Sequence, residues 1–240
     1  MSNPMFNKIN TMEAVIDEKG SMTIQGACLK TGFLLLLALV SALVTWNLVI
    51  NGFTDKASML AFGGIIVGFI AVICASFKKQ FSYIIAPIYA LAEGLSLGAI
   101  SAVYNNYANG IVIQAVLATL ITLFAMLFLY SSGLIKVTKT FLKVVYIATA
   151  SIFIFYLITT LAYYFKITFL APLVGAYDNV FVICAVIVIA AFNLIVDFYF
   201  IEQGANSYFP KYMEWYSALG LMVTIVWLYI EFLRLFSKRR

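Results

Sequence analysis

Long apolar runs separated by short polar segments make up most of this 240-residue chain. A helix needs about 20 apolar residues to cross the hydrocarbon core of a bilayer. We expect membrane-spanning helices over Gly32–Ile50, Ser58–Phe77, Tyr83–Tyr104, Ile111–Tyr130, Val144–Phe165, Asn179–Ile201 and Ser217–Phe236. The runs lack the alternation of apolar and polar residues that a transmembrane barrel requires. The pattern therefore predicts an all-α integral membrane protein, a bundle of seven transmembrane helices joined by short connections.

Composition supports a membrane protein, because 64% of the residues are hydrophobic and only 10% are charged. A soluble domain carries about 25% charged residues. The chain divides into a polar N-terminal segment (1–29), a membrane domain (30–236) and a basic tail (237–240). Residues 1–29 contain no apolar stretch typical of a cleavable signal peptide. We therefore expect the first span itself to target the chain to the membrane.

The net charge of +5 does not indicate a nucleic-acid partner, since the basic residues form no stripe with interleaved aromatics. The lipid bilayer is the expected partner, and lysines in the loops set the orientation. One side collects nine lysines and the other only two, Lys56 and Lys166. The nine are Lys8, Lys19, Lys30, Lys78, Lys79, Lys136, Lys139, Lys143 and Lys211. This bias predicts a cytoplasmic N-terminus.

The basic tail disagrees with that rule, because seven full crossings place Arg234 and the residues after it outside. A re-entrant last segment would return the tail to the cytoplasm. Ser217–Phe236 is long enough to cross, and tail charges orient a protein less strongly than early loops do. We favour seven crossings.

Two acidic residues lie in long apolar runs that contain no Lys, Arg or His. Glu93 lies within 84–100, and Asp197 follows 180–196. A charge at bilayer depth costs several kcal/mol or more, so such acids usually face a protein interior or a water-filled path. The structural alternative is a buried neutral acid that is hydrogen-bonded to Ser, Asn or Tyr. A third acid, Glu231, lies three residues before Arg234, a spacing that allows an ion pair on one helix face.

Pairs of glycines four residues apart predict close helix packing. Gly64 and Gly68 form one pair, and Gly94 and Gly98 form the other. Glu93 immediately precedes Gly94, so we expect its side chain to lie beside this face and to point into the bundle. Packing alone is sufficient to explain the glycines.

The chemistry of buried acids favours a pH-dependent ion path. Burial disfavours the ionised form, and two neighbouring acids titrate as a unit. Lys78 and Lys79 end the second span at a depth similar to that of Asp197, which suggests a latch that protonation of Asp197 would release. Carboxylates are also preferred ligands of Ca²⁺, which makes Asp197 a candidate calcium ligand.

Enzymatic chemistry has little support in the sequence. The chain has no histidine, which excludes His-based triads and His-ligated metals. Cys28, Cys74 and Cys184 lack metal-like spacing. Neither Glu93 nor Asp197 lies in a Gly-x-Gly-Asp segment, which we would expect in an intramembrane aspartic protease. We expect no enzymatic activity and no cofactor, with calcium only as a transported ion.

Short sequence pieces along the chain match one family in order and spacing. They are Met22-Thr23, Lys30-Thr31, Ala92–Gly98, Asn193–Phe198, Ile201–Gly204 and Tyr212–Thr224, leading into Trp227–Arg234. From about Met22 onward, the chain resembles the Bax inhibitor-1 family in its bacterial YccA-like branch. The resemblance implies a seven-helix fold with a central last helix. It also implies a multi-pass protein of the bacterial inner membrane that acts as a pH-sensitive calcium leak.

The resemblance also implies a pH sensor made of two aspartates, one in span six and one in span seven. Asp197 matches the first, whereas Thr224 stands where the second would be. The pair of acids is therefore broken unless Glu231 or Glu93 takes the second place, and we expect the proton-sharing or cationic partner of Asp197 to be another residue than Thr224.

Two other functions remain open. Some bacterial relatives restrain a membrane-bound AAA protease, so a modulator that docks through its polar N-terminal segment is one alternative. A proton-coupled transporter is the other.

Overall fold

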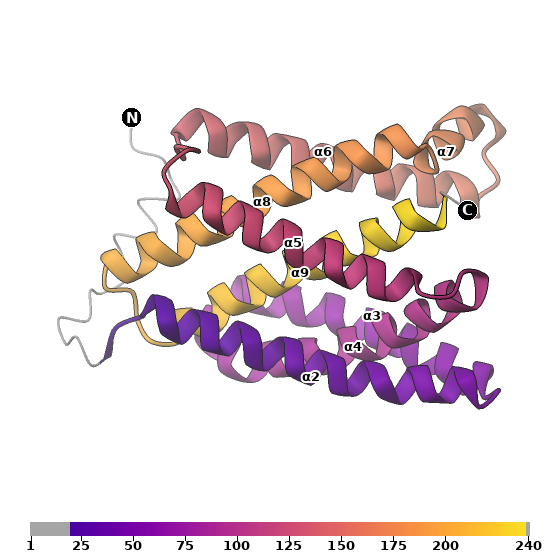
Figure 1. Ribbon diagram of the computed structural model, residues 1–240, viewed down its shortest axis with the longest axis horizontal. Coiled ribbons are helices and arrows are strands. Elements are labelled where there is room, and N and C mark those ends of the chain that lie inside the picture. The colour runs from indigo at the N-terminus through magenta and orange to yellow at the C-terminus, as the bar shows by residue number, and fades with distance from the viewer. Residues whose placement is uncertain (1–19, 239–240) are drawn as a thin grey trace. The chain divides into compact units, whose positions relative to one another are not determined.

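The structure is a computed structural model that describes residues 20–238, and its long elements are all helices (Figure 1). They are α2 (Ile24–Ile50), α3 (Thr54–Phe77), α4 (Ser82–Tyr107), α5 (Ile111–Ser131), α6 (Lys139–Tyr164), α8 (Val180–Asn206) and α9 (Met213–Ser237). These seven helices are long and apolar enough to cross a membrane, which confirms the predicted fold class. Three short helices complete the described chain: η2 (Lys79–Phe81), η3 (Thr168–Leu170) and α7 (Ala171–Tyr177).

The helices extend beyond the apolar runs that predict them. α2 begins at Ile24 instead of Gly32, because the side chain of Thr23 accepts a hydrogen bond from the backbone N–H of Gly26 and caps the helix. The boundary predicted after residue 29 therefore falls inside a helix. The remaining predictions for residues 1–19, and those for Arg239 and Arg240, lie outside the described residues.

The chain divides into two compact units, and α4, α8 and α9 each contribute to both. Unit 1 comprises Met1–Ile100 and Tyr199–Met222. Unit 2 comprises Ser101–Phe198 and Val223–Arg240. α9 is the most buried of the seven spans, as the predicted central position of the last helix requires.

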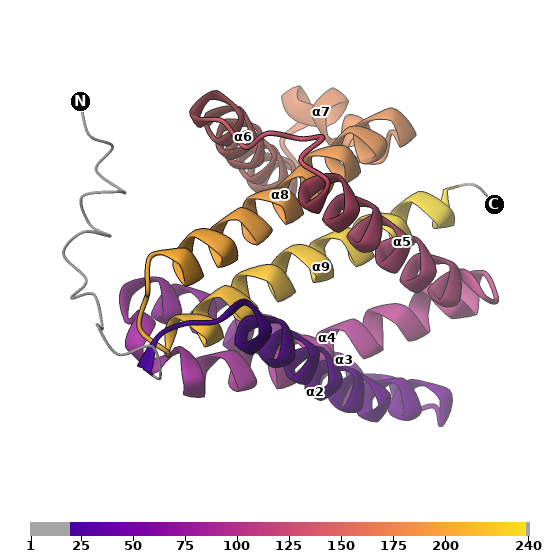
Figure 2. The same cartoon turned by 60° about the vertical axis from the view of Figure 1, so that its left-hand side comes forward.

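In unit 1, glycines bring α4 close to both α2 and α3 (Figure 2). A Cβ placed on Gly98 would lie 2.0 Å from the carbonyl oxygen of Ala42 in α2. A Cβ on Gly64 of α3 would lie 2.3 Å from the carbonyl oxygen of Ala92 in α4. These approaches leave no room for a side chain, so each glycine is required for the contact.

The start of α2 is also tied to the connection between α8 and α9 within unit 1. Ser21 and Pro210 form an antiparallel β-bridge. The backbone N–H of Met22 donates to the carbonyl of Phe209 at 2.6 Å. These bonds hold the start of the first span beside the start of the last.

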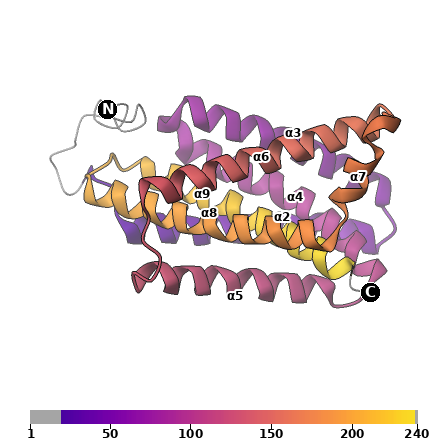
Figure 3. The same cartoon turned by 90° about the horizontal axis from the view of Figure 1, so that it is seen from above.

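In unit 2, polar side chains link neighbouring helices. Asn193 of α8 donates to Thr149 of α6 at 2.7 Å, and Ser101 and Tyr229 share a hydrogen bond of 2.6 Å. Hydrogen bonds of this kind contribute modestly to helix association in membranes. Figure 3 shows α7 at the end of this unit where α6 ends and α8 begins.

Candidate functional site

Four acidic side chains of the spans, Glu93, Asp197, Glu214 and Glu231, fall into two kinds, according to whether a cationic side chain is paired with them. Glu214 and Glu231 are each paired with a cationic side chain. Within residues 20–238, Asp197 and Glu93 form no ion pair. This difference separates structural acids from candidates for ion or proton binding.

Asp197 of α8 has a hydroxyl as its partner. Thr224 of α9, which is buried, donates a hydrogen bond from Oγ1 to Asp197 Oδ2 at 2.6 Å. That distance is typical of a hydroxyl bound to a carboxylate. Asn193 lies one turn earlier on α8, so the two polar side chains share one face of an otherwise apolar helix.

That Asp197 has its proton-sharing or cationic partner elsewhere stays a prediction, but Thr224 supplies a hydrogen bond that the sequence does not predict. Thr224 occupies the position that the resemblance gives to a second aspartate, and it still binds Asp197. A hydroxyl partner is close to the structural alternative stated for these acids, in which a neutral polar side chain hydrogen-bonds the carboxyl group. A buried threonine hydroxyl satisfies a carboxylate oxygen equally well, because it can donate one hydrogen bond.

Glu231, which the sequence offers as a substitute for the second acid, has its carboxylate bound by other side chains of unit 2. Arg234 donates to both of its oxygens at 2.9 and 3.1 Å, which confirms the predicted ion pair. Tyr156 donates its hydroxyl to Glu231 Oε1 at 2.8 Å. Arg234 also donates to the carbonyl of Tyr177 at 2.7 Å and stacks over its ring. This cluster joins α6, α7 and α9 within unit 2, and its charges compensate each other.

A cavity of about 510 Å³ lies beside this cluster in unit 2. Its lining includes Tyr104, Tyr107, Tyr177, Asp178, Arg234 and Lys238. Asp178 and Lys238 form an ion pair of 3.0 Å. The cavity therefore combines aromatic walls with two pairs of compensated charges.

Glu93 lies on α4 against Gly68 of α3. A Cβ placed on Gly68 would lie 3.2 Å from Glu93 Oε2 and 3.7 Å from the ring of Tyr89, so the missing side chain leaves room for the carboxylate. In the part of the chain that the structure describes, this carboxylate accepts no hydrogen bond. Glu93 thus lies between two helices of unit 1, as an acid without a cationic partner.

Glu214 is a buried acid that the sequence did not single out. Its side chain is fully buried in unit 1, at the start of α9. It accepts hydrogen bonds from the backbone N–H and the hydroxyl of Thr23, at 2.9 and 2.8 Å, and from Lys30. Lys211 approaches it to 3.6 Å. The spacing of Lys211 and Glu214 is local, but no local pattern signals the pairing with Lys30, because Lys30 and Glu214 are 184 residues apart in sequence.

Lys78 and Lys79 lie over aromatic rings of unit 1. Lys78 Nζ is 5.9 Å from the centroid of Phe81, and Lys79 Nζ is 5.0 Å from that of Tyr216. The latch between these lysines and Asp197 stays a prediction.

Asp197 belongs to no preformed carboxylate cage for calcium. Among the described residues, no three His, Cys, Asp or Glu side chains gather as a metal site. Ca²⁺ takes about six to eight oxygen ligands, whereas Asp197 and Thr224 together offer three side-chain oxygens.

A multi-pass helical membrane protein with acids inside its spans is the class that this fold and site define. The chain belongs to the family described as Bax inhibitor 1 like, which matches residues 3–240. Comparisons with curated proteins and with solved structures give no match. Membership of this family is consistent with a channel-like role in a membrane. The bacterial branch and the inner-membrane location stay predictions.

Proposed function

We propose that the chain is a passive cation leak, with Ca²⁺ as the conducted ion and Asp197 as the group that makes conduction depend on pH. The observation that carries the proposal is the contact between Asp197 and Thr224. A carboxylate inside a span with a neutral hydroxyl as its partner keeps its charge available to a passing cation. The family's channel-like role supports the same reading.

The other acids strengthen the assignment by contrast. Glu231 and Glu214 are bound by Arg234 and Lys30, so their charges contribute to the fold. Removing one partner of a buried ion pair leaves an uncompensated charge, which makes such acids poor sites for a mobile ion. Glu93 has no cationic partner among residues 20–238, so we assign it a second role on the path, the binding of a cation or a proton in unit 1.

Calcium flux into vesicles tests the proposal directly. The full-length protein is reconstituted with a trapped Ca²⁺-sensitive dye, and flux is recorded from acidic to alkaline pH. Asp197→Asn mimics the protonated acid and retains an oxygen that can accept from Thr224. We expect its flux to be independent of pH and equal to that of the wild type at the acidic limit. If Asp197→Asn follows the wild-type curve at every pH, Asp197 does not have this role.

The direction in which wild-type Ca²⁺ flux changes with pH discriminates between two mechanisms for Asp197. If the charge of Asp197 only attracts cations, flux falls as the pH is lowered. If protonation releases a latch to Lys78 or Lys79, flux rises instead. Asp178→Asn is the matched control, because Asp178 is an exposed acid at a helix end. We expect this control to keep the wild-type pH dependence.

Docking to a membrane-bound protease is tested separately by deleting residues 2–19. The backbone contacts that the structure describes between the start of α2 and the α8–α9 connection are made by residues from Gly20 onward, which the deletion keeps. The deletion should therefore leave the leak intact. Loss of protease binding alone would support docking through this segment, whereas loss of the leak alone would contradict it.

A further inference from the structure

Consecutive residues at the start of α9 hold lysines that come from other elements of unit 1. Lys30 of α2 pairs with Glu214, and its Nζ lies 5.4 Å from the ring centroid of Trp215. Lys79 of η2 lies 5.0 Å from the ring centroid of Tyr216. Contacts between ammonium groups and aromatic faces are attractive, so both lysines are held at this end of the unit.

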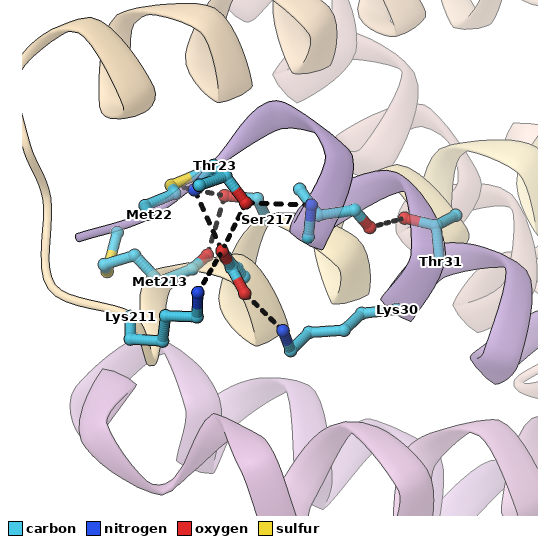
Figure 4. Close-up of polar contacts among 10 residues, drawn as sticks. Met22, Thr23, Lys30, Thr31, Lys211, Met213 and Ser217 are labelled. Atoms are coloured by element: carbon cyan, nitrogen blue, oxygen red, sulfur yellow. Dashed lines mark hydrogen bonds and ion pairs between the residues drawn. The ribbon is translucent and has the colours of Figure 1, made fainter. Parts of the chain in front are cut away.

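A third lysine joins them from the connection before α9. Lys211 Nζ lies 3.6 Å from Glu214, and Figure 4 shows Lys211 and Lys30 directed toward the same point. The side chain of Lys211 is 56% exposed, whereas that of Glu214 is 0% exposed. The acid is therefore enclosed, Lys211 presents its ammonium group at the surface, and the side chain of Lys30 is 19% exposed.

Positive charge exceeds negative charge at this end of unit 1. The described lysines here are Lys30, Lys78, Lys79 and Lys211, and the described acids are Glu202 and Glu214. An excess of lysines at the ends of spans attracts anionic lipid headgroups, which carry a phosphate.

Because helices of spanning length end at the headgroup layer, we expect this surface to lie there. α2, α3, α4 and α9 each begin or end here, as the bounds of these spans require. Exposed rings lie beside them, with Phe77 and Phe81 at the end of α3 and in η2 and Tyr83 at the start of α4. Aromatic side chains of this kind gather where a membrane meets water. An anionic group that reaches the lysines at the level of the headgroups would belong to a lipid.

We propose that Lys30, Lys79 and Lys211 bind the phosphate of an anionic phospholipid headgroup at the start of α9. Trp215 and Tyr216 orient two of the lysines, and the enclosed Glu214 fixes Lys30 and draws Lys211 inward. The site is independent of ion conduction, so the failure of either proposal leaves the other standing.

Native mass spectrometry of the purified full-length protein in mild detergent tests the site. The protein is titrated with phosphatidylglycerol or with phosphatidylcholine, and bound lipids are counted. We expect phosphatidylglycerol to bind more tightly. Lys79→Gln and Lys211→Gln should each weaken its binding about five-fold, and the double variant should weaken it further. Both variants keep the contact between Lys30 and Glu214.

Exposed lysines outside this surface supply the control. Lys136→Gln/Lys139→Gln removes the same amount of charge from the α5–α6 connection and the start of α6. We expect it to bind phosphatidylglycerol as the wild type does. Three outcomes would overturn the proposal: equal loss in this control, unchanged binding in Lys79→Gln/Lys211→Gln, or equal binding of the two lipids. Complete displacement of the lipid by inorganic phosphate at the same concentration would indicate an adventitious ion only.

Discussion

Thr224 of α9 donates a hydrogen bond of 2.6 Å to Asp197 of α8, so a hydroxyl fills the position where the family resemblance places a second carboxyl. The pairing of spans six and seven is therefore kept, while the number of titratable groups in it falls from two to one. With one titratable group, we expect the pH dependence of this site to show a single step.

Thr224→Asp should restore a pair of acids. Two carboxyls at this distance share a proton and titrate as a unit, so the pH profile of calcium flux should gain a second step. Flux in reconstituted vesicles measures this, and Thr224→Ser, which keeps the hydroxyl, should retain the wild-type profile. An unchanged profile in Thr224→Asp would show that this position does not influence conduction.

Thr224→Val should destabilise the protein by about 1–3 kcal/mol, because it leaves the carboxylate of Asp197 without its donor. Thermal unfolding in detergent measures the loss. Combining Thr224→Val with Asp197→Asn gives a double-mutant cycle. If the hydrogen bond is the cause, the two effects will not add. Additive effects would mean that valine acts through packing instead.

The two ion pairs of unit 2 should differ widely in strength. Arg234→Met should cost about 3–5 kcal/mol, because it leaves Glu231 buried without its cation. Asp178→Asn should cost about 0–1 kcal/mol, since the side chains of Lys238 and Asp178 are 39% and 58% exposed. Unfolding of both variants under identical conditions measures the difference. Similar losses in both would contradict the assignment of Glu231 to the fold.

Adjacent glycines of α3 offer an internal comparison for helix packing. Gly64→Ala should disrupt the contact with α4, because its Cβ would meet the carbonyl oxygen of Ala92 at 2.3 Å. Gly63→Ala has open space around its Cβ and should stabilise the helix by up to about 1 kcal/mol. Thermal unfolding of the two variants should therefore shift in opposite directions. Equal shifts would mean that the close approach of α3 and α4 is not required.

The sequence predicts the seven spans well because their signal is local, a run of apolar residues of sufficient length. It predicts the ion pair of Glu231 and Arg234 for the same reason, because the two residues lie three positions apart in one helix. The start of α2 is missed because Thr23, a capping residue, outweighs the polar residues that follow it. Glu214 and Lys30 cannot be linked in this way, because only the folded chain brings them together.

The hydrogen bond between Thr224 and Asp197 is not predicted for a different reason. The sequence identifies Thr224 as the residue where a second aspartate would stand, but it does not indicate that the hydroxyl reaches Asp197. Hydrogen-bond geometry depends on where a side chain lies in space, and that information enters only with the packing of α8 against α9.

The ties between the start of α2 and the start of α9 have a consequence for biosynthesis. A ribosome makes Thr23 and Lys30 at the beginning of translation and Glu214 close to its end. Until α9 is made, Lys30 has no carboxylate to bind, and Met22 has no backbone carbonyl at Phe209 to pair with. The first span therefore gains these contacts only after the last span has been made. A polypeptide that ends before residue 209 lacks both of them.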